Sequence, residues 1–225
     1  CLAAGTVIIG AKFEESLSAE AETEVGIELP VIMYHGLLKD PAMQGKYVIS
    51  PDLFEQDLQY LQSNGFETVC IKELVNYVDG KGTLPEKPIL LTFDDGFYNN
   101  YYYAYPLAKK YTMKIVIAPV GAYTDKATAE NDPHATYSYL SWKDIKEMAD
   151  SGLVEFQNHT YDLHSNKAGR TGTKRVAGES EEEYKNLLIK DLGSMQKKLE
   201  ECLGDTPQCF VYPFGAISDG EPDII

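Results

Sequence analysis

Ile-Leu-Leu-Thr-Phe-Asp-Asp-Gly, at residues 89–96, is the stretch of sequence that best indicates the fold. The apolar run is short and is bounded by Pro88 and Gly96, which predicts a buried strand. Its carboxyl end carries two adjacent carboxylates, Asp94 and Asp95, into a turn. Because neighbouring side chains of a strand point in opposite directions, these two cannot clamp one ion together. Asp-Gly is also a common turn dipeptide, so the rest of the chain must decide whether the pair serves a metal site.

Strand and helix patterns alternate on both sides of this segment. We expect strands over residues 29–35, 68–70, 89–95, 114–120, 154–157 and 210–212, and helices over residues 51–63, 72–78, 99–111, 141–149 and 181–203. Ser50, Ser141 and Ser180 are typical N-terminal caps of three of these helices. Residues 121–139 are expected to form a polar loop. The alternation predicts an α/β fold with a mostly parallel sheet or barrel, whose active-site residues lie at the carboxyl ends of strands.

Two histidines follow the predicted strand at residues 154–157, at the same kind of strand end as the two aspartates. They lie in His159-Thr-Tyr-Asp-Leu-His164, a separation of five residues that does not fit one face of a helix. A loop must therefore present both rings. Two imidazoles and a carboxylate can bind zinc while leaving positions open for water and substrate, which favours a metal site over isolated surface histidines.

The order of three motifs resembles the NodB-type polysaccharide deacetylases, which form carbohydrate esterase family 4. The motifs are Thr-Phe-Asp-Asp-Gly, then His-Thr with a second histidine, then Tyr-Pro-Phe-Gly. The segment Pro-Val-Ile-Met-Tyr-His at residues 30–35 and the region at residues 50–61 look like the branch that contains the poly-N-acetylglucosamine deacetylases. The resemblance covers roughly residues 29–220 and implies a distorted (β/α) barrel of the NodB type.

The resemblance also implies roles for the first two motifs. Asp95, His159 and His164 would hold a divalent metal, expected to be Zn²⁺. Asp94 would be the general base that takes a proton from the metal-bound water as it attacks the acetyl carbonyl. The expected partner is a carbohydrate polymer.

For the third motif, Tyr212-Pro213-Phe214-Gly215, the resemblance implies contact with the substrate. Proline and glycine fix the backbone of this turn. The Phe214 N–H could then point at a developing oxyanion and stabilise it together with the metal. We therefore expect Tyr212, Pro213 and Phe214 to be substrate-binding residues.

Three features depart from the common family pattern. Many members separate the two histidines by one residue fewer, although the poly-N-acetylglucosamine branch resembles the longer form. Many carry an arginine two residues before the motif proline, where this chain has Val211, so another group must orient Asp94. The chain ends at Ile225, before the segments that supply an acetyl pocket and a histidine acid, so we expect a barrel that is incomplete at its C-terminus. His35 could reach the pocket from the first strand or serve only a structural role.

Composition limits the partners and the organisation of the chain. The 225 residues carry a formal net charge of -15, which argues against nucleic acid or an anionic membrane as the main partner and permits a neutral or cationic polymer. We expect residues 1–28 to be the remnant of an export signal or membrane anchor with a linker, although the apolar run at residues 2–11 could also be a first strand. We expect residues 29–225 to form one deacetylase domain.

Export would place the protein outside the cell or at the cell surface. In an oxidising compartment Cys202 and Cys209, which flank a short turn, could form a disulfide. Two free thiols are the alternative. The sequence does not specify an oligomeric state.

The sequence therefore predicts a hydrolase that acts on carbon–nitrogen bonds other than peptide bonds. The expected reaction is metal-dependent deacetylation of an N-acetylglucosamine-containing polysaccharide from a cell wall or biofilm matrix. An acetylxylan-type carbohydrate esterase is the nearest alternative. The alternative outside catalysis is a carbohydrate-binding module, or an inactive fragment of the same fold, which would bind metal or sugar without releasing acetate.

Overall fold

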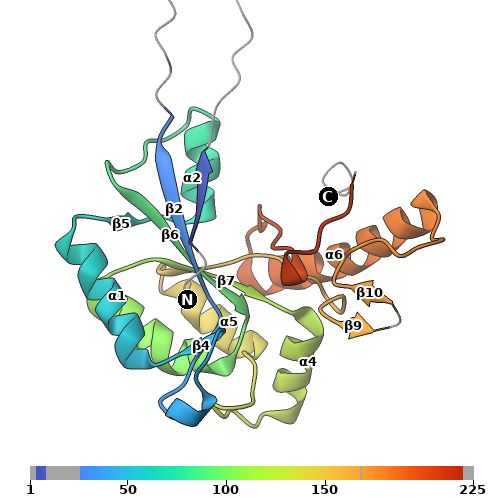
Figure 1. Ribbon diagram of the computed structural model, residues 1–225, viewed down its shortest axis with the longest axis horizontal. Helices are drawn as coiled ribbons and strands as arrows, with labels where there is room; N and C mark the ends of the chain where they lie inside the picture. Colours follow the sequence, from blue (N-terminus) through green and yellow to red (C-terminus); the bar gives the residue numbers. More distant parts are fainter. Residues whose placement is uncertain (1–3, 9–25, 168, 220–225) are drawn as a thin grey trace, which may run out of the picture.

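A six-stranded sheet is the centre of the computed structural model, which describes residues 4–8, 26–167 and 169–219 (Figure 1). Its strands are β1 (Ala4–Ile8), β2 (Glu28–Tyr34), β5 (Glu67–Thr68), β6 (Pro88–Asp95), β7 (Ile115–Pro119) and β8 (Val154–Phe156). They are ordered β1-β2-β6-β7-β8, with β5 paired to the first residues of β6. Within this sheet all paired strands are parallel except β1 and β2. The predicted α/β fold is confirmed, and the described residues form an open sheet rather than a closed barrel.

Helices cover both faces of this sheet. The α-helices are α1 (Pro51–Ser63), α2 (Ile71–Val78), α3 (Tyr105–Tyr111), α4 (Gly121–Glu130), α5 (Trp142–Asp150) and α6 (Glu181–Leu203), and a π-helix, η2 (Asn100–Ala104), directly precedes α3. The predicted caps are confirmed, because the hydroxyls of Ser50, Ser141 and Ser180 each accept the backbone N–H three residues later. These caps fix where α1, α5 and α6 begin.

Short elements complete the described chain. They are the strand pair β3 (Gly36–Leu37) and β4 (Val48–Ile49), the 3₁₀ helices η1 (Pro41–Met43) and η3 (Pro213–Gly215), and the hairpin of β9 (Asn166–Lys167) and β10 (Arg170–Thr171). Figure 1 shows that β9, β10 and the outer half of α6 form an arm at the side of the sheet.

Strand β6 is buried on both faces, as its continuous apolar run predicts. Ile89, Leu91 and Phe93 belong to the larger core, which they share with buried residues of α1, α3, α5 and α6. Leu90 points to the opposite face and belongs to a smaller core with Leu74 of α2. Because both faces of β6 are packed, the position of its carboxyl end is firmly determined.

The prediction of a loop at residues 121–139 is wrong for the first half of this segment, which forms α4. The sequence there has little amphipathic periodicity, so the pattern gave no helix signal. The helix begins where the N–H groups of Gly121 and Ala122 donate to the carbonyls of Thr160 and Tyr161, at 3.0 and 2.7 Å. These contacts satisfy two of the N–H groups that a helix start leaves unpaired. The accepting carbonyls belong to a segment that lies far from α4 in the sequence.

The strand expected at residues 210–212 is reduced to one parallel bridge between Phe210 and Asn158. Prolines at positions 207 and 213 lack the N–H that a longer ladder requires, which limits the pairing to this point. The segment nevertheless lies beside the end of β8. The Val211 N–H donates to the Asn158 carbonyl at 2.9 Å.

The N-terminal prediction is only partly covered by the described residues. Strand β1 pairs antiparallel to β2, with Ala4 opposite Ile32, whereas residues 9–25, which include most of the expected linker, lie outside the described residues. Within the described residues no helix combines the length and apolar character needed to cross a membrane. Cys202 and Cys209 are free thiols.

Candidate metal centre and catalytic site

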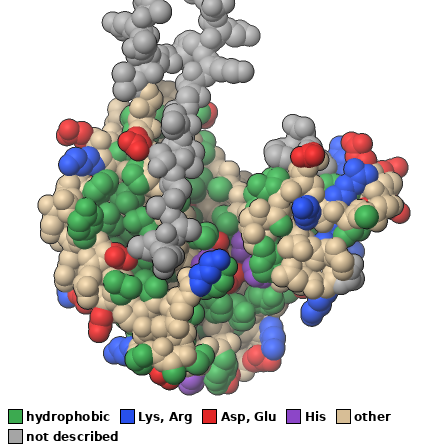
Figure 2. Space-filling model, viewed as in Figure 1, with side chains coloured by type: hydrophobic (Ala, Val, Ile, Leu, Met, Phe, Trp, Pro, Cys, Tyr) green, Lys and Arg blue, Asp and Glu red, His purple; other side chains and the backbone are tan. Residues whose placement is uncertain are grey.

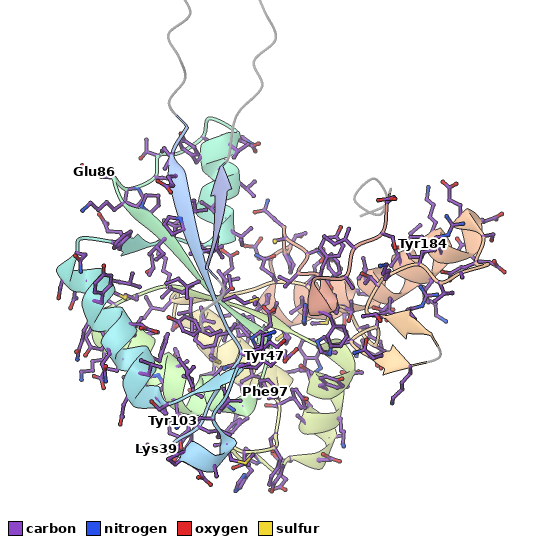
Figure 3. All side chains as sticks on the ribbon, in the orientation of Figure 1. Lys39, Tyr47, Glu86, Phe97, Tyr103 and Tyr184 are labelled. Carbon is purple, nitrogen blue, oxygen red and sulfur yellow. The ribbon has the colours of Figure 1, made fainter. Side chains whose placement is uncertain are left out.

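The two aspartates lie at the carboxyl end of β6, between its neighbours β2 and β7. Figure 3 labels Glu86 and Phe97, which flank the two ends of this strand. The backbone turns sharply here, with φ of 71° at both Asp95 and Gly96. A Cβ at Gly96 would lie 2.9 Å from Pro119 Cα, so only glycine fits this turn beside β7. The Asp-Gly dipeptide is therefore both a turn and the support of the candidate site.

Asp95, His159 and His164 converge, as the motifs predict. Asp95 Oδ1 lies 3.0 Å from His164 Nε2 and 3.6 Å from His159 Nε2. The three potential ligand atoms all lie within 4.8 Å of one another. Figure 2 shows histidine side chains in a hollow between the main body of the sheet and the arm that contains α6. A metal ion at this point could be reached from the solvent.

The chemistry of these donors fits a metal ion. His159 Nδ1 lies 2.7 Å from the Val211 carbonyl oxygen, which can only accept, so Nδ1 carries the proton and Nε2 keeps its lone pair. Asp95 Oδ1 is buried and has no hydrogen-bond partner among the described residues, although two imidazoles lie close to it. An anionic oxygen in this state suits a cation between the three side chains. Two imidazoles and one carboxylate also leave coordination positions open.

Burial and the histidines act in opposite directions on the two carboxylates. Burial favours a raised pKa at Asp95, but His159 and His164 outweigh it and hold the pKa of Asp95 well below its usual range. At Asp94 burial prevails and raises the pKa, although His159 and His35 oppose it. The two neighbouring carboxylates therefore differ in their tendency to take up a proton.

Asp94 faces a different partner from Asp95. Its Oδ2 lies 4.0 Å from His35 Nε2, at the end of β2. The ring of His35 packs against Tyr47, with centroids 4.9 Å apart, and Asn100 Nδ2 donates to the His35 carbonyl at 2.8 Å. Of the two roles considered for His35, the one in the pocket agrees with this position. The signal in the sequence was a histidine at the end of a strand that adjoins β6.

The turn at residues 212–215 reaches the same cluster. Pro213 is buried, whereas Phe214 is 51% exposed and its ring centroid lies 4.4 Å from that of His164. Phe214 has a φ of 59°, which is uncommon for a non-glycine residue and marks a sharp turn. The structure thus brings the third motif beside the first two, while the oxyanion role of the Phe214 N–H stays a prediction.

Further aromatic residues that the sequence analysis did not single out lie beside the cluster. Phe97 stacks on Tyr139 with centroids 5.1 Å apart, and Tyr139 contacts Tyr123 at 4.5 Å. The Tyr123 hydroxyl donates to the His164 carbonyl at 3.0 Å. Nothing in the local sequence pattern marks these rings, because they come from three separate segments.

Comparisons with known proteins identify relatives of this chain. A poly-β-1,6-N-acetyl-D-glucosamine N-deacetylase of Staphylococcus aureus (strain MSSA476) is 30% identical over 179 residues, which cover 80% of this chain and 58% of the relative. The protein of the same name from Escherichia coli K12 is 28% identical over 202 residues, which cover 82% of this chain and 30% of the relative. The chain therefore spans only 58% and 30% of the lengths of these two relatives.

Two solved structures show the same fold. A de-N-acetylase from Aggregatibacter actinomycetemcomitans has a TM-score of 0.74 and 31% identity, and the match covers 87% of this chain and 83% of that one. IcaB from Ammonifex degensii has a TM-score of 0.72 and 30% identity, with 87% and 78% covered. A family model described as polysaccharide deacetylase matches residues 81–222, more than half of the chain. The resemblance in the three motifs is confirmed, and the chain belongs to the polysaccharide deacetylase family.

Proposed function

We propose that the chain catalyses metal-dependent N-deacetylation of an N-acetylglucosamine polysaccharide, outside the cell or at the cell surface. The observation that carries the proposal is the convergence of Asp95, His159 and His164 beside a second acid–base pair, Asp94 and His35. Relatives named as poly-β-1,6-N-acetyl-D-glucosamine N-deacetylases support the choice of polymer. We therefore expect β-1,6-linked N-acetylglucosamine to be the preferred substrate.

Asp95, His159 and His164 would hold the metal, and their donor set suits Zn²⁺. A bound metal of this kind polarises a carbonyl oxygen and lowers the pKa of water at its open positions. The chain keeps the ligands ready for it, since the Val211 carbonyl fixes the ring orientation of His159. The negative charge of Asp95 is retained because both histidines favour it.

Asp94 and His35 would carry out the two proton transfers, Asp94 as the base and His35 as the acid. Asp94 would take a proton from the attacking water while the water oxygen forms a bond to the carbonyl carbon of the acetyl group. When the carbon–nitrogen bond breaks, His35 in its protonated form gives a proton to the departing amine, so that acetate and a free amino sugar leave. The 4.0 Å separation of Asp94 Oδ2 and His35 Nε2 lets both groups face the same reacting centre.

The turn at residues 212–215 would bind the sugar. The exposed ring of Phe214 lies beside His164 and offers an apolar surface to a pyranose ring or to the acetyl methyl group. We expect the Phe214 N–H to stabilise the oxyanion that develops on the acetyl carbonyl. Tyr212 and the buried Pro213 would support this turn.

The experiment that tests the function is acetate release with Zn²⁺ present. The substrates are β-1,6- and β-1,4-linked N-acetylglucosamine oligomers and acetylxylan, and the variants are Asp94→Asn and Glu86→Gln. Glu86 is exposed at the opposite end of β6, so it is a matched carboxylate-to-amide control. We expect release from the β-1,6-linked oligomer that is lost in Asp94→Asn and kept in Glu86→Gln.

Other outcomes identify the alternatives. Release from acetylxylan alone would point to a carbohydrate esterase. Zinc binding without acetate release from any of the three substrates would contradict the proposed activity and favour a carbohydrate-binding role for the same site.

A further inference from the structure

We propose that Asp191, on α6, is a positioning residue that sets the metal affinity of the site by holding the loop between His159 and His164. This inference rests on the metal site of the proposed function. Asp191 does not belong to the cluster of candidate ligands. It would act through the backbone that carries them.

Both carboxylate oxygens of Asp191 are used on this loop. Oδ1 accepts the Tyr161 N–H at 2.8 Å, and Oδ2 accepts the Asp162 N–H at 2.9 Å. Asp191 is 9% exposed, so water contributes little to these contacts. The two N–H groups are consecutive and lie midway between the two histidines. One side chain therefore fixes the middle of the ligand-bearing loop.

The carbonyl groups of the same loop are held from the other side by α4. Gly121 N–H donates to the Thr160 carbonyl at 3.0 Å, and Ala122 N–H donates to the Tyr161 carbonyl at 2.7 Å. The approach is close, because a Cβ at Gly121 would lie 2.5 Å from Tyr161 Cδ2. The loop is thus clamped between the start of α4 and the middle of α6.

The spacing of the histidines explains why the loop needs such a clamp. A separation of five residues allows neither a helix face nor a strand face to orient both rings. Strand β8 ends at Phe156, before the first ligand, and Thr160, next to His159, has a φ of 74°, which neither a helix nor a strand provides. Tyr161 is half-buried and Asp162 is exposed, so both hydrogen bonds to Asp191 are partly shielded from water. Without Asp191, the two N–H groups would lose these acceptors and the loop would shift to reach others. A shift of the loop would change the distance between the two imidazoles.

Asp191 is also well placed for a role separate from the stability of α6. It lies near the middle of α6, whereas Tyr184 lies close to the first residue of the helix, at its outer end (Figure 3). The cap of α6 is formed by Ser180 and Glu183, which hydrogen-bond to each other and not to the loop. Changes at the cap and at Asp191 can therefore be compared on one helix.

The test measures zinc affinity directly, by competition of the metal-free protein with a chromophoric chelator. We expect Asp191→Asn to bind Zn²⁺ roughly 10- to 100-fold more weakly than the wild type. The amide can accept only one of the two N–H groups and turns its own NH₂ towards the other. Glu183→Gln makes the same chemical change on the same helix, and Ser180→Ala weakens the cap. We expect both controls to keep the wild-type zinc affinity.

The outcomes distinguish failure of the metal site from failure of the positioning role of Asp191. A wild-type protein that binds no zinc would overturn the metal site itself, and with it the proposed function. A wild type that binds zinc, with Asp191→Asn equal to it, would overturn the positioning role alone, and so would an equal loss of affinity in Ser180→Ala. If Asp191→Asn does not fold, Asp191→Glu keeps the charge and moves both acceptor oxygens by one methylene. Unchanged affinity in that variant would also overturn the role.

Discussion

The two sides of the metal cluster are supported in different ways. Asp95 ends a strand that is paired to β2 and β7 through main-chain hydrogen bonds. His159 and His164 belong to a loop that α6 holds through the side chain of Asp191 and α4 through its first N–H groups. Main-chain pairing depends on few side-chain identities, whereas the loop depends on single residues. We therefore expect the Asp95 strand to be most sensitive to substitutions that add a side chain where two backbones are in close contact. We expect the histidine loop to be most sensitive to the loss of a single anchoring side chain.

The largest effect is expected where the two sides meet. Removing the metal with a chelator should reduce acetate release to background. The reason is that Asp95, His159 and His164 would act on water only through the metal that they hold. Adding Zn²⁺ back should restore the activity, with the metal content followed by atomic absorption. Full activity in protein shown to be free of metal would mean that the cluster is not a catalytic metal site.

A smaller loss is expected for the second acid–base group on the strand side. His35→Gln should lower kcat by about 10²- to 10⁴-fold while zinc affinity stays unchanged, since His35 faces Asp94 and not the metal ligands. His134→Gln is the matched control, because His134 lies in an exposed segment between α4 and α5. A kcat equal to that of the control variant would leave His35 with a structural role only.

The next effect is a loss of stability at Gly96, where the backbone lies close to Pro119. Gly96→Ala should lower the free energy of unfolding by about 2–5 kcal/mol, because a positive φ and a clash with Pro119 act together. Gly65→Ala is the control, since Gly65 also has a positive φ, of 74°, but a Cβ there meets nothing within 4 Å. We expect it to cost only about 1 kcal/mol. Urea unfolding of both variants measures the difference, and equal costs would show that the approach to β7 is not restrictive.

The smallest effect concerns a second anchor on the loop side, the Asp125 carboxylate. Asp125 accepts hydrogen bonds from Tyr161 Oη at 2.9 Å, Trp142 Nε1 at 2.8 Å and Lys198 Nζ at 3.0 Å. Burial favours a raised pKa, but these three donors outweigh it and lower the pKa of Asp125 below its ordinary value. A lowered folded-state pKa means that the anchor stabilises the fold above the unfolded-state pKa, near 4, and that this contribution is lost as the pH falls through the folded-state value.

We therefore expect Asp125→Asn to lower the free energy of unfolding by about 1 kcal/mol at pH 7. The difference from the wild type should shrink as the pH falls below about 4. Urea unfolding at a series of pH values measures it. A difference that stays constant down to pH 2 would show that the charge of Asp125 has no part in holding Tyr161.

Local pattern was sufficient for many elements of the fold. Apolar runs and caps located β6, α1, α5 and α6, because burial on two faces and a serine before a helix leave clear local signals. The start of α4 could not be predicted in the same way. Its first N–H groups are paired with a loop about 40 residues later in the chain, and a weakly amphipathic sequence does not reveal such a partner.

The sequence by itself determined the family, the α/β class and the residue types of the site, because three motifs occur in a specific order and each ends a predicted strand. It also separated Asp94 from Asp95, since adjacent strand residues point to opposite sides. Only the tertiary structure placed His35 beside Asp94, the Val211 carbonyl on His159, and Asp191 on the ligand loop. The last two contacts join residues 52 and 30 positions apart. No local periodicity encodes such pairs, because they depend on how the sheet and α6 bring distant segments together.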